Sequence, residues 1–225
     1  MVGNFAQPGY VGILAHNRAH FGDRVAITID DRAMTFAQLA DQVEAVRRVL
    51  APHVNPGDRV AIWLPNSFAW IATFLAIVSL RAISVPVNTR LTVAELDVIL
   101  RDSAARVLVA TSRYRGRNYF AEAADSRIAC PVVIDASDQA EPADWPVRRA
   151  AAAVDPTPPE RDDLFCIQYT SGTTSTPKGV MLTERMYLQT ALWCVRCQML
   201  TPESSFMSAA PFFHCSGSMH AITVC

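Results

Sequence analysis

The sequence contains few charged residues and no excess of either sign. Only 18% of its 225 residues are Asp, Glu, Lys or Arg, whereas an average soluble domain has about 25%. Basic and acidic residues number 20 and 21, so we expect no nucleic-acid partner, which would require a basic surface. Because 51% of the residues are apolar, the chain can bury a core, and disorder is excluded as its main state.

Long apolar runs and an export signal are also absent. The longest apolar stretch, residues 68–80, has 13 residues and contains Thr73 and Ser79, whereas a transmembrane helix needs roughly 20. The first residues, MVGNFAQPGY, have neither the basic start nor the apolar centre of a signal peptide. We therefore expect no transmembrane segment and a cytoplasmic protein with reduced cysteines.

Apolar strands alternate with helices along the chain. Capping boxes, in which a threonine is followed three residues later by Gln or Glu, predict helix starts at Thr35 and Thr92. Solid apolar strands separated by helices are typical of an α/β fold with mainly parallel sheets and helices on both faces. The predicted strands are 25–29, 59–64, 83–87, 106–110, 131–134 and 164–169, and the predicted helices are 36–50, 67–81, 92–103 and 113–125.

The alternation stops between residues 135 and 163. Five prolines and scattered charges interrupt this segment. A structureless loop of this length is uncommon inside a compact domain. We therefore interpret 135–163 as a surface excursion or a linker that forms a soft internal boundary.

The most unusual segment follows the strand predicted at 164–169. Residues 170–179 read TSGTTSTPKG, with six hydroxyl side chains in ten positions and the only lysine of the chain, Lys178. Gly172 and Gly179 bracket the loop, and glycine permits backbone angles that other residues avoid. Open α/β sheets bind ligands beyond the carboxyl ends of their strands. Hydroxyls, backbone N–H groups and an ammonium in such a loop predict a site for phosphate oxygens.

This loop is not a Walker A motif, because that motif ends in Gly-Lys-Ser/Thr, whereas here Pro177 precedes Lys178 and Gly179 follows it. Instead, Tyr169–Gly179 resembles the signature loop of the adenylate-forming (AMP-binding) enzymes, which include acyl-CoA synthetases, amino-acid-activating domains and luciferases. Two further stretches are similar to other core motifs of that superfamily, namely residues 80–96 and Ala210–His214 with Gly217. The resemblance covers nearly the whole chain and is strongest to the fatty-acid and other acyl-CoA synthetases.

The resemblance implies a two-step reaction. A carboxylate attacks ATP to give an acyl-adenylate and pyrophosphate, and a thiol, usually that of CoA, then displaces AMP. It thus implies ATP and Mg²⁺ as cofactors, CoA as co-substrate and a small carboxylic acid, by similarity a fatty acid, as substrate. The implied nucleotide-binding residues are Thr170, Ser171, Gly172, Thr173, Thr174, Ser175, Thr176, Lys178 and Gly179.

His214 is the candidate catalytic residue that the resemblance implies. It matches a family histidine near the acyl carboxylate, to which a neutral imidazole could donate a hydrogen bond. From the residues alone, a core histidine beside Phe212 and Phe213 is the favoured interpretation, which the match to the family motif reverses. Amino-acid-activating domains place an aspartate near this point to pair with the substrate ammonium, and none occurs between 203 and 225. This favours a simple carboxylic acid as substrate.

The sequence departs from the family pattern at several positions. Ser175 and Ile83 replace common glycines, and Glu184 and Met186 replace the His and Asn often found after the loop. A serine at 175 could crowd the phosphates or strain the backbone.

The family's later motifs would all follow residue 225. They include the adenine-framing segment, a Mg²⁺-binding Glu, a ribose-binding Asp and the C-terminal lid with its lysine. We therefore expect residues 1–225 to form an incomplete N-terminal part of the large AMP-binding domain without the lid, with an apolar helix beginning near 216. Such a truncated or split-gene product would be inactive alone and could pair with a complementary C-terminal chain.

Three other functions are open from the sequence. The chain could be a non-catalytic fragment or interaction module that retains the phosphate-binding loop, or an ATPase that needs no acid. A metal site could form from Cys194, Cys197, His214 and Cys215. One CxxC pair is a weak signal, however, and its helical spacing favours core cysteines. We therefore predict no metal site.

Overall fold

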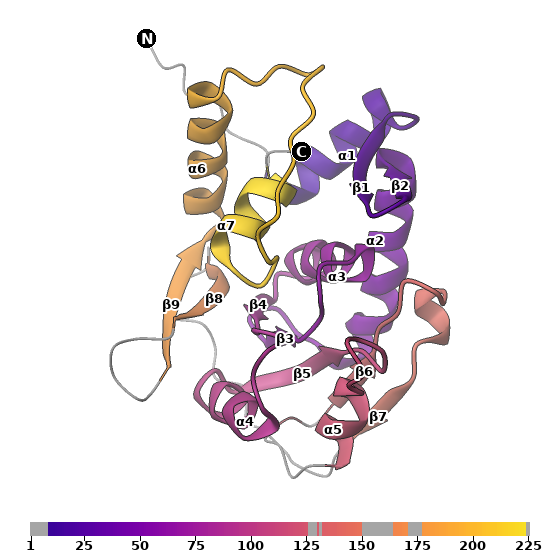
Figure 1. Cartoon of the computed structure of the whole chain (residues 1–225), viewed down its shortest axis with the longest axis vertical. Helices are drawn as coiled ribbons and strands as arrows, with labels where there is room; N and C mark the ends of the chain where they lie inside the picture. The colour runs from indigo at the N-terminus through magenta and orange to yellow at the C-terminus, as the bar shows by residue number, and fades with distance from the viewer. Residues whose placement is uncertain (1–8, 126–129, 131, 150–163, 171–176, 224–225) are drawn as a thin grey trace.

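The computed structural model describes residues 9–125, 130, 132–149, 164–170 and 177–223. They contain a seven-stranded sheet of order β7-β6-β5-β3-β4-β8-β9 (Figure 1). The inner strand pairs are parallel, and only the outermost pairs, β6–β7 and β8–β9, are antiparallel. The predicted mainly parallel α/β sheet is therefore confirmed. Its strands are β3 (Arg59–Ile62), β4 (Ile83–Pro86), β5 (Ala105–Ala110), β6 (Val132–Asp135), β7 (Val147–Arg149), β8 (Leu164–Thr170) and β9 (Lys178–Thr183).

Helices cover both faces of the sheet, as predicted. Val60 and Ile62 of β3 pack into one core with α2 (Phe36–Leu50) and α3 (Phe68–Ser79). Ala61, between them, packs into a second core with α4 (Val93–Asp102) and α5 (Tyr119–Asp125). Successive strand residues point to opposite faces, so a sheet covered on both sides needs strands that are apolar at every position. This explains the solid apolar runs in the sequence.

The helix starts follow from local capping. Thr35 accepts a hydrogen bond from the Gln38 N–H at 3.2 Å, and the Gln38 side chain accepts one from the Thr35 N–H at 2.9 Å. Thr92 and Glu95 make the same reciprocal pair at 3.3 and 2.8 Å. Both predicted capping boxes are confirmed. Each satisfies backbone donors that the first helical turn leaves free.

Other elements differ from the sequence-based prediction. The helix predicted from residue 113 begins at Tyr119, because Tyr114 and Arg117 bridge a tight turn with Gly116 at φ 76°. Within 135–163, where no regular structure was expected, η2 (Pro142–Asp144) and β7 form, and β7 pairs with β6. The remaining elements are α1 (Tyr10–Phe21), β1 (Val25–Ile29), β2 (Arg32–Thr35), η1 (Ala51–His53), α6 (Glu184–Cys197), α7 (Cys215–Gly217) and the π-helical η3 (Ser218–Thr223).

The first helix, α1, is held by the last elements of the chain. The Glu184 carboxylate at the start of α6 accepts a hydrogen bond from the Tyr10 N–H at 2.6 Å. The Tyr10 hydroxyl is hydrogen-bonded to Thr223 of η3. In Figure 1, α1, α6 and α7 accordingly lie on the same side of β3–β6, in the upper part of the view. Glu184, a departure from the family pattern, thus has a structural partner of its own.

Candidate functional site

The two ends of the hydroxyl-rich loop meet in the β8–β9 hairpin. Thr170, the last residue of β8, pairs with Lys178, the first residue of β9, and Tyr169 pairs with Gly179. Because β8 is parallel to β4, this end of the hairpin lies at the carboxyl edge of the sheet, where α/β folds bind ligands. The remaining predicted loop residues, Ser171, Gly172, Thr173, Thr174, Ser175 and Thr176, lie outside the described residues.

Lys178 presents its ammonium to solvent at this edge. Its side chain is exposed, and it forms no ion pair with any residue that the structure describes. An exposed lysine without a protein anion beside it is a mobile point charge that suits phosphate oxygens. The chemistry of the described part of the loop therefore fits an anionic ligand.

Gly179 is required by packing. A Cβ atom added there would lie 2.8 Å from Cγ2 of Ile167 and 3.2 Å from Cζ of Tyr169 across the hairpin. Its φ is not among the positive values of the described residues, so the predicted reason, an unusual backbone angle, is wrong at this position. Glycine allows the Tyr169 ring to lie close against β9 at this position.

Tyr169 ties the base of the loop to α4. Its hydroxyl donates a hydrogen bond of 2.5 Å to the Asp102 carboxylate at the end of that helix. Burial, together with this carboxylate, raises the pKa of Tyr169 well above its usual range. The phenol therefore stays protonated and remains a donor at physiological pH.

The segment that carries His214 is bound by two carboxamide side chains. Asn66 accepts a hydrogen bond from the Phe212 N–H at 2.7 Å and donates one to the Ala210 carbonyl at 3.0 Å. Gln168 of β8 donates through Nε2 to the Phe213 carbonyl at 2.6 Å. Since Gln168 and Thr170 point to the same face of β8, His214 follows a backbone that is docked on the loop's own strand. Sequence reasoning missed both amides.

His214 is exposed, so its interpretation as a core histidine is wrong. Its Nδ1 accepts a hydrogen bond from the Ser216 N–H at 3.2 Å and lies 2.8 Å from the Ser216 hydroxyl. A ring nitrogen that accepts from a backbone N–H carries no proton, so this contact assigns the proton of the neutral imidazole to Nε2. His214 can therefore offer an Nε2–H donor to a ligand.

The other described residues that the sequence analysis singled out do not have a comparable arrangement of hydrogen bonds near the loop. Cys194 is half-buried and Cys197 is exposed, so their interpretation as core cysteines is wrong. The described residues contain no group of three or more His, Cys, Asp and Glu side chains that could hold a metal ion. Ile83, at a common glycine position of the family, is the first residue of β4 and is buried, with 1% of its surface exposed.

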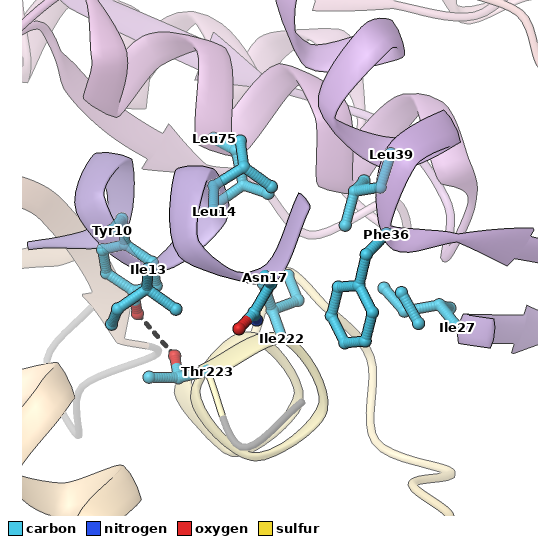
Figure 2. Close-up of a pocket in the computed structure, with 11 residues that line it drawn as sticks. Tyr10, Ile13, Leu14, Asn17, Ile27, Phe36, Leu39, Leu75, Ile222 and Thr223 are labelled. Carbon is cyan, nitrogen blue, oxygen red and sulfur yellow. Dashed lines mark hydrogen bonds between the residues drawn. The ribbon is translucent and has the colours of Figure 1, made fainter. Parts of the chain in front are cut away.

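A small cavity lies away from these residues, between α1, β1, α2 and η3. Leu14, Phe36, Leu75 and Ile222 are among the residues that line it, and Figure 2 shows Tyr10 hydrogen-bonded to Thr223 at one side. Its volume is about 40 Å³, whereas small-molecule sites usually have about 300–1,000 Å³. We interpret it as a packing gap.

Comparison with known proteins identifies the family of the chain. A family model described as AMP-binding enzyme matches residues 14–225. The chain belongs to the AMP-binding enzyme family. The resemblance to the adenylate-forming enzymes is thereby confirmed, and the fold is that of the N-terminal portion of such an enzyme.

Relatives in the AMP-binding family act on different acids. The chain is 33% identical over 227 residues to the 3-[(3aS,4S,7aS)-7a-methyl-1,5-dioxo-octahydro-1H-inden-4-yl]propanoyl:CoA ligase of Rhodococcus jostii (strain RHA1), covering 91% of this chain and 43% of that protein. It is 31% identical over 237 residues to a long-chain-fatty-acid–CoA ligase of Mycobacterium tuberculosis (strain ATCC 25618 / H37Rv), covering 95% of this chain and 44% of that protein.

Among solved structures, O-succinylbenzoate coenzyme A synthetase of Bacillus subtilis in complex with AMP superposes with a TM-score of 0.75. The identity is 26%, over 96% of this chain and 53% of that one. The chain thus spans less than half of the length of the curated relatives quoted above. None of the helices in the described part is both long and apolar enough to cross a membrane.

Proposed function

We propose that this chain supplies the phosphate-binding part of an acyl-CoA synthetase, an enzyme that activates a carboxylic acid with ATP and transfers it to CoA. The observation that carries the proposal is the docking of two family motifs on one strand. The ends of the signature loop pair in the β8–β9 hairpin, and the segment before His214 is hydrogen-bonded to β8 through Gln168. This arrangement supports a site where phosphates and an acid carboxylate would meet.

The described residues would contribute charge and hydrogen bonds. Lys178 would bind phosphate oxygens as a point charge, and the hydroxyl of Thr170, which pairs with Lys178 across the hairpin, would add a donor. Mg²⁺, when bound with ATP, would neutralise part of the phosphate charge. The Nε2–H of His214 would donate to the acid carboxylate and orient it. Holding both reactants in fixed geometry can lower the reaction barrier by several kcal/mol, about 7–11 in well-oriented cases.

The acid itself belongs to the proposal. We propose an acid without an ammonium group, since residues 203–225 contain no aspartate to pair with one. A fatty acid remains our preferred substrate. One relative quoted above is a long-chain-fatty-acid ligase, whereas another acts on a bicyclic propanoate. An aromatic or polycyclic acid is therefore the competing class.

Acid-dependent ATP–pyrophosphate exchange tests the proposal. The purified chain would be assayed with octanoate, palmitate and benzoate, alone and with a polypeptide that carries the remaining part of the AMP-binding fold. Exchange that needs both an acid and Lys178 would support acid activation. ATP hydrolysis that is independent of any acid would instead identify an ATPase and overturn the proposal.

A second candidate function is a non-catalytic interaction module. It is favoured by the exposed apolar residues of β9 and α6, where Val180, Met181 and Trp193 are 45%, 55% and 67% exposed. Apolar patches on soluble proteins often mark a surface that another protein covers. Tight binding of a complementary chain without any acid-dependent exchange in the complex would favour this alternative.

A further inference from the structure

The backbone that precedes His214 is held by side chains rather than by a strand. Asn66, in the turn after β3, contacts residues 210–212 with both atoms of its carboxamide, one accepting and one donating. This is the pattern of donor and acceptor that a neighbouring strand would supply. The 210–212 segment is therefore fixed in height and direction above the carboxyl end of β3.

Gln168 fixes the same segment from β8. Its side chain is only 7% exposed, and its Nε2 donates to the Phe213 carbonyl at 2.6 Å. Its Oε1 is buried and has no hydrogen-bond partner among the described residues. An unpaired buried oxygen lowers stability, and an apolar side chain of the same size would avoid that cost. Stability alone thus does not explain a glutamine here, whereas the bond to Phe213 does.

The hold on residues 210–213 extends to the imidazole. The His214 N–H donates to the Pro211 carbonyl at 3.0 Å, and the His214 carbonyl accepts from the Ser218 N–H at 3.0 Å. Gly217 lies against this turn so closely that an added Cβ would be 2.0 Å from the Pro211 oxygen. The Ser216 N–H then orients the ring through Nδ1. From Asn66 and Gln168 to the imidazole, each link is a direct contact.

We propose that Asn66 and Gln168 are positioning residues for His214, which they hold at the phosphate-loop edge of the sheet by an amide clamp on residues 210–213. The proposal rests on the proposed function, in which His214 orients the acid carboxylate. It predicts that loss of either amide displaces His214 and raises the apparent KM for the acid, while ATP binding through Lys178 is retained.

The first test measures the clamp and needs no activity. Hydrogen exchange would be followed by mass spectrometry in the wild-type chain and in Asn66→Leu and Gln168→Met. Gln42→Met is the matched control, because Gln42 also has a buried Oε1 without a described partner but lies on α2. We expect amides of residues 210–218 to exchange about tenfold faster in the two clamp variants only. Unchanged exchange over 210–218 would overturn the proposal.

Asn66→Asp provides a graded variant should Asn66→Leu fold poorly. The aspartate keeps an acceptor for the Phe212 N–H but cannot donate to the Ala210 carbonyl. Its exchange over 210–218 is expected to fall between those of the wild-type chain and Asn66→Leu. If hydrogen exchange over 210–218 in Asn66→Asp were as slow as in wild type, the hydrogen bond that Asn66 donates to the Ala210 carbonyl would contribute nothing to holding the segment.

The second test asks whether the clamp acts through His214. In acid-dependent pyrophosphate exchange with octanoate and benzoate, Gln168→Met should raise the apparent KM for the acid about tenfold and change that for ATP less than about twofold. In a His214→Ala background, the same substitution should add no further loss. Full additivity would overturn the positioning role. Absence of acid-dependent exchange in the wild-type complex would reject the proposed function, while the hydrogen-exchange result would still decide the clamp.

Discussion

Lys178 carries the cationic charge at the end of the β8–β9 hairpin. Replacing it with alanine should weaken binding of ATP to the chain by about 1.5–3 kcal/mol, the usual contribution of a charge-assisted hydrogen bond. Lys178→Arg should restore only part of this affinity, because a planar guanidinium is not a point charge. Isothermal titration calorimetry of the three proteins measures the difference. Equal affinities would remove Lys178 from the phosphate site.

The buried thiols make a second test at the scale of single residues. Burial raises the pKa of Cys166 to about 11 and that of Cys130 to about 12, from an ordinary value of 9.0. Between the ordinary thiol pKa and these raised pKa values, the unfolded chain loses thiol protons that the folded chain keeps. Their contribution to stability is therefore complete below pH 9 and is lost as the pH rises towards 11–12. Urea unfolding at pH 8, 9 and 10 should show a falling free energy of unfolding.

Cys166→Ala is the control for that pH dependence. It removes one of the two thiols whose proton the folded chain keeps in this range, so the decrease in unfolding free energy between pH 9 and pH 10 should become shallower than in wild type. A decrease that is just as steep in Cys166→Ala would show that other groups cause it, with the buried tyrosines as the first candidates.

Among the elements, α1 depends on a residue distant in sequence. The Glu184 carboxylate accepts from the Tyr10 N–H and places negative charge beside the first turn of α1, where it is favourable. Glu184→Ala should lower the free energy of unfolding by about 0.5–2 kcal/mol, as loss of a helix cap does. Glu184→Gln keeps an acceptor and should cost less. Urea unfolding would measure both.

Gln189→Ala, at an exposed position of the same helix, is the matched control for Glu184→Ala. It changes α6 without touching α1 and should leave stability nearly unchanged. If Glu184→Ala were no more destabilising than Gln189→Ala, the contact with Tyr10 would contribute nothing to the docking of α1.

The predictability of these elements follows the range of their contacts. The helices after Thr35 and Thr92 were predicted because their caps lie three residues away. The helix α1 was missed because the acceptor for Tyr10 lies 174 residues further along the chain. The edge strands β7 and β9 form by pairing with β6 and β8, and strands on an exposed edge need no apolar run.

The residues of the candidate site were likewise predictable only where short-range patterns in the sequence carry them. Lys178 and His214 were predicted because short motifs carry them. Asn66 and Gln168 were missed because their contacts join residues 144–146 and 45 positions apart. A single asparagine or glutamine in a sequence gives no sign of such a partner. Side-chain amides that bind distant backbone are recognised only once the fold brings them together.

For the molecule as a whole, the open edge of the sheet sets the expected behaviour in solution. In the described part of the chain, β9 pairs with β8 and ends the strand order. Val180 and Met181 of β9 are about half exposed, and Trp193 of the adjoining α6 is 67% exposed. An apolar edge strand with free backbone groups recruits another strand. The chain alone should therefore self-associate unless a complementary polypeptide covers β9.

Val180→Lys tests this association, because a lysine on an edge strand opposes pairing by charge and by the cost of burying it. Val98→Lys is the matched control, since Val98 is 43% exposed, close to the 45% of Val180, but lies on α4, whose backbone groups are already paired within the helix. Sedimentation velocity at several protein concentrations should show a monomer for Val180→Lys under conditions in which the wild type and Val98→Lys associate. Equal thermal unfolding midpoints would show that all three keep the same fold. Association that persists in Val180→Lys, or that Val98→Lys abolishes equally, would place the contact away from β9.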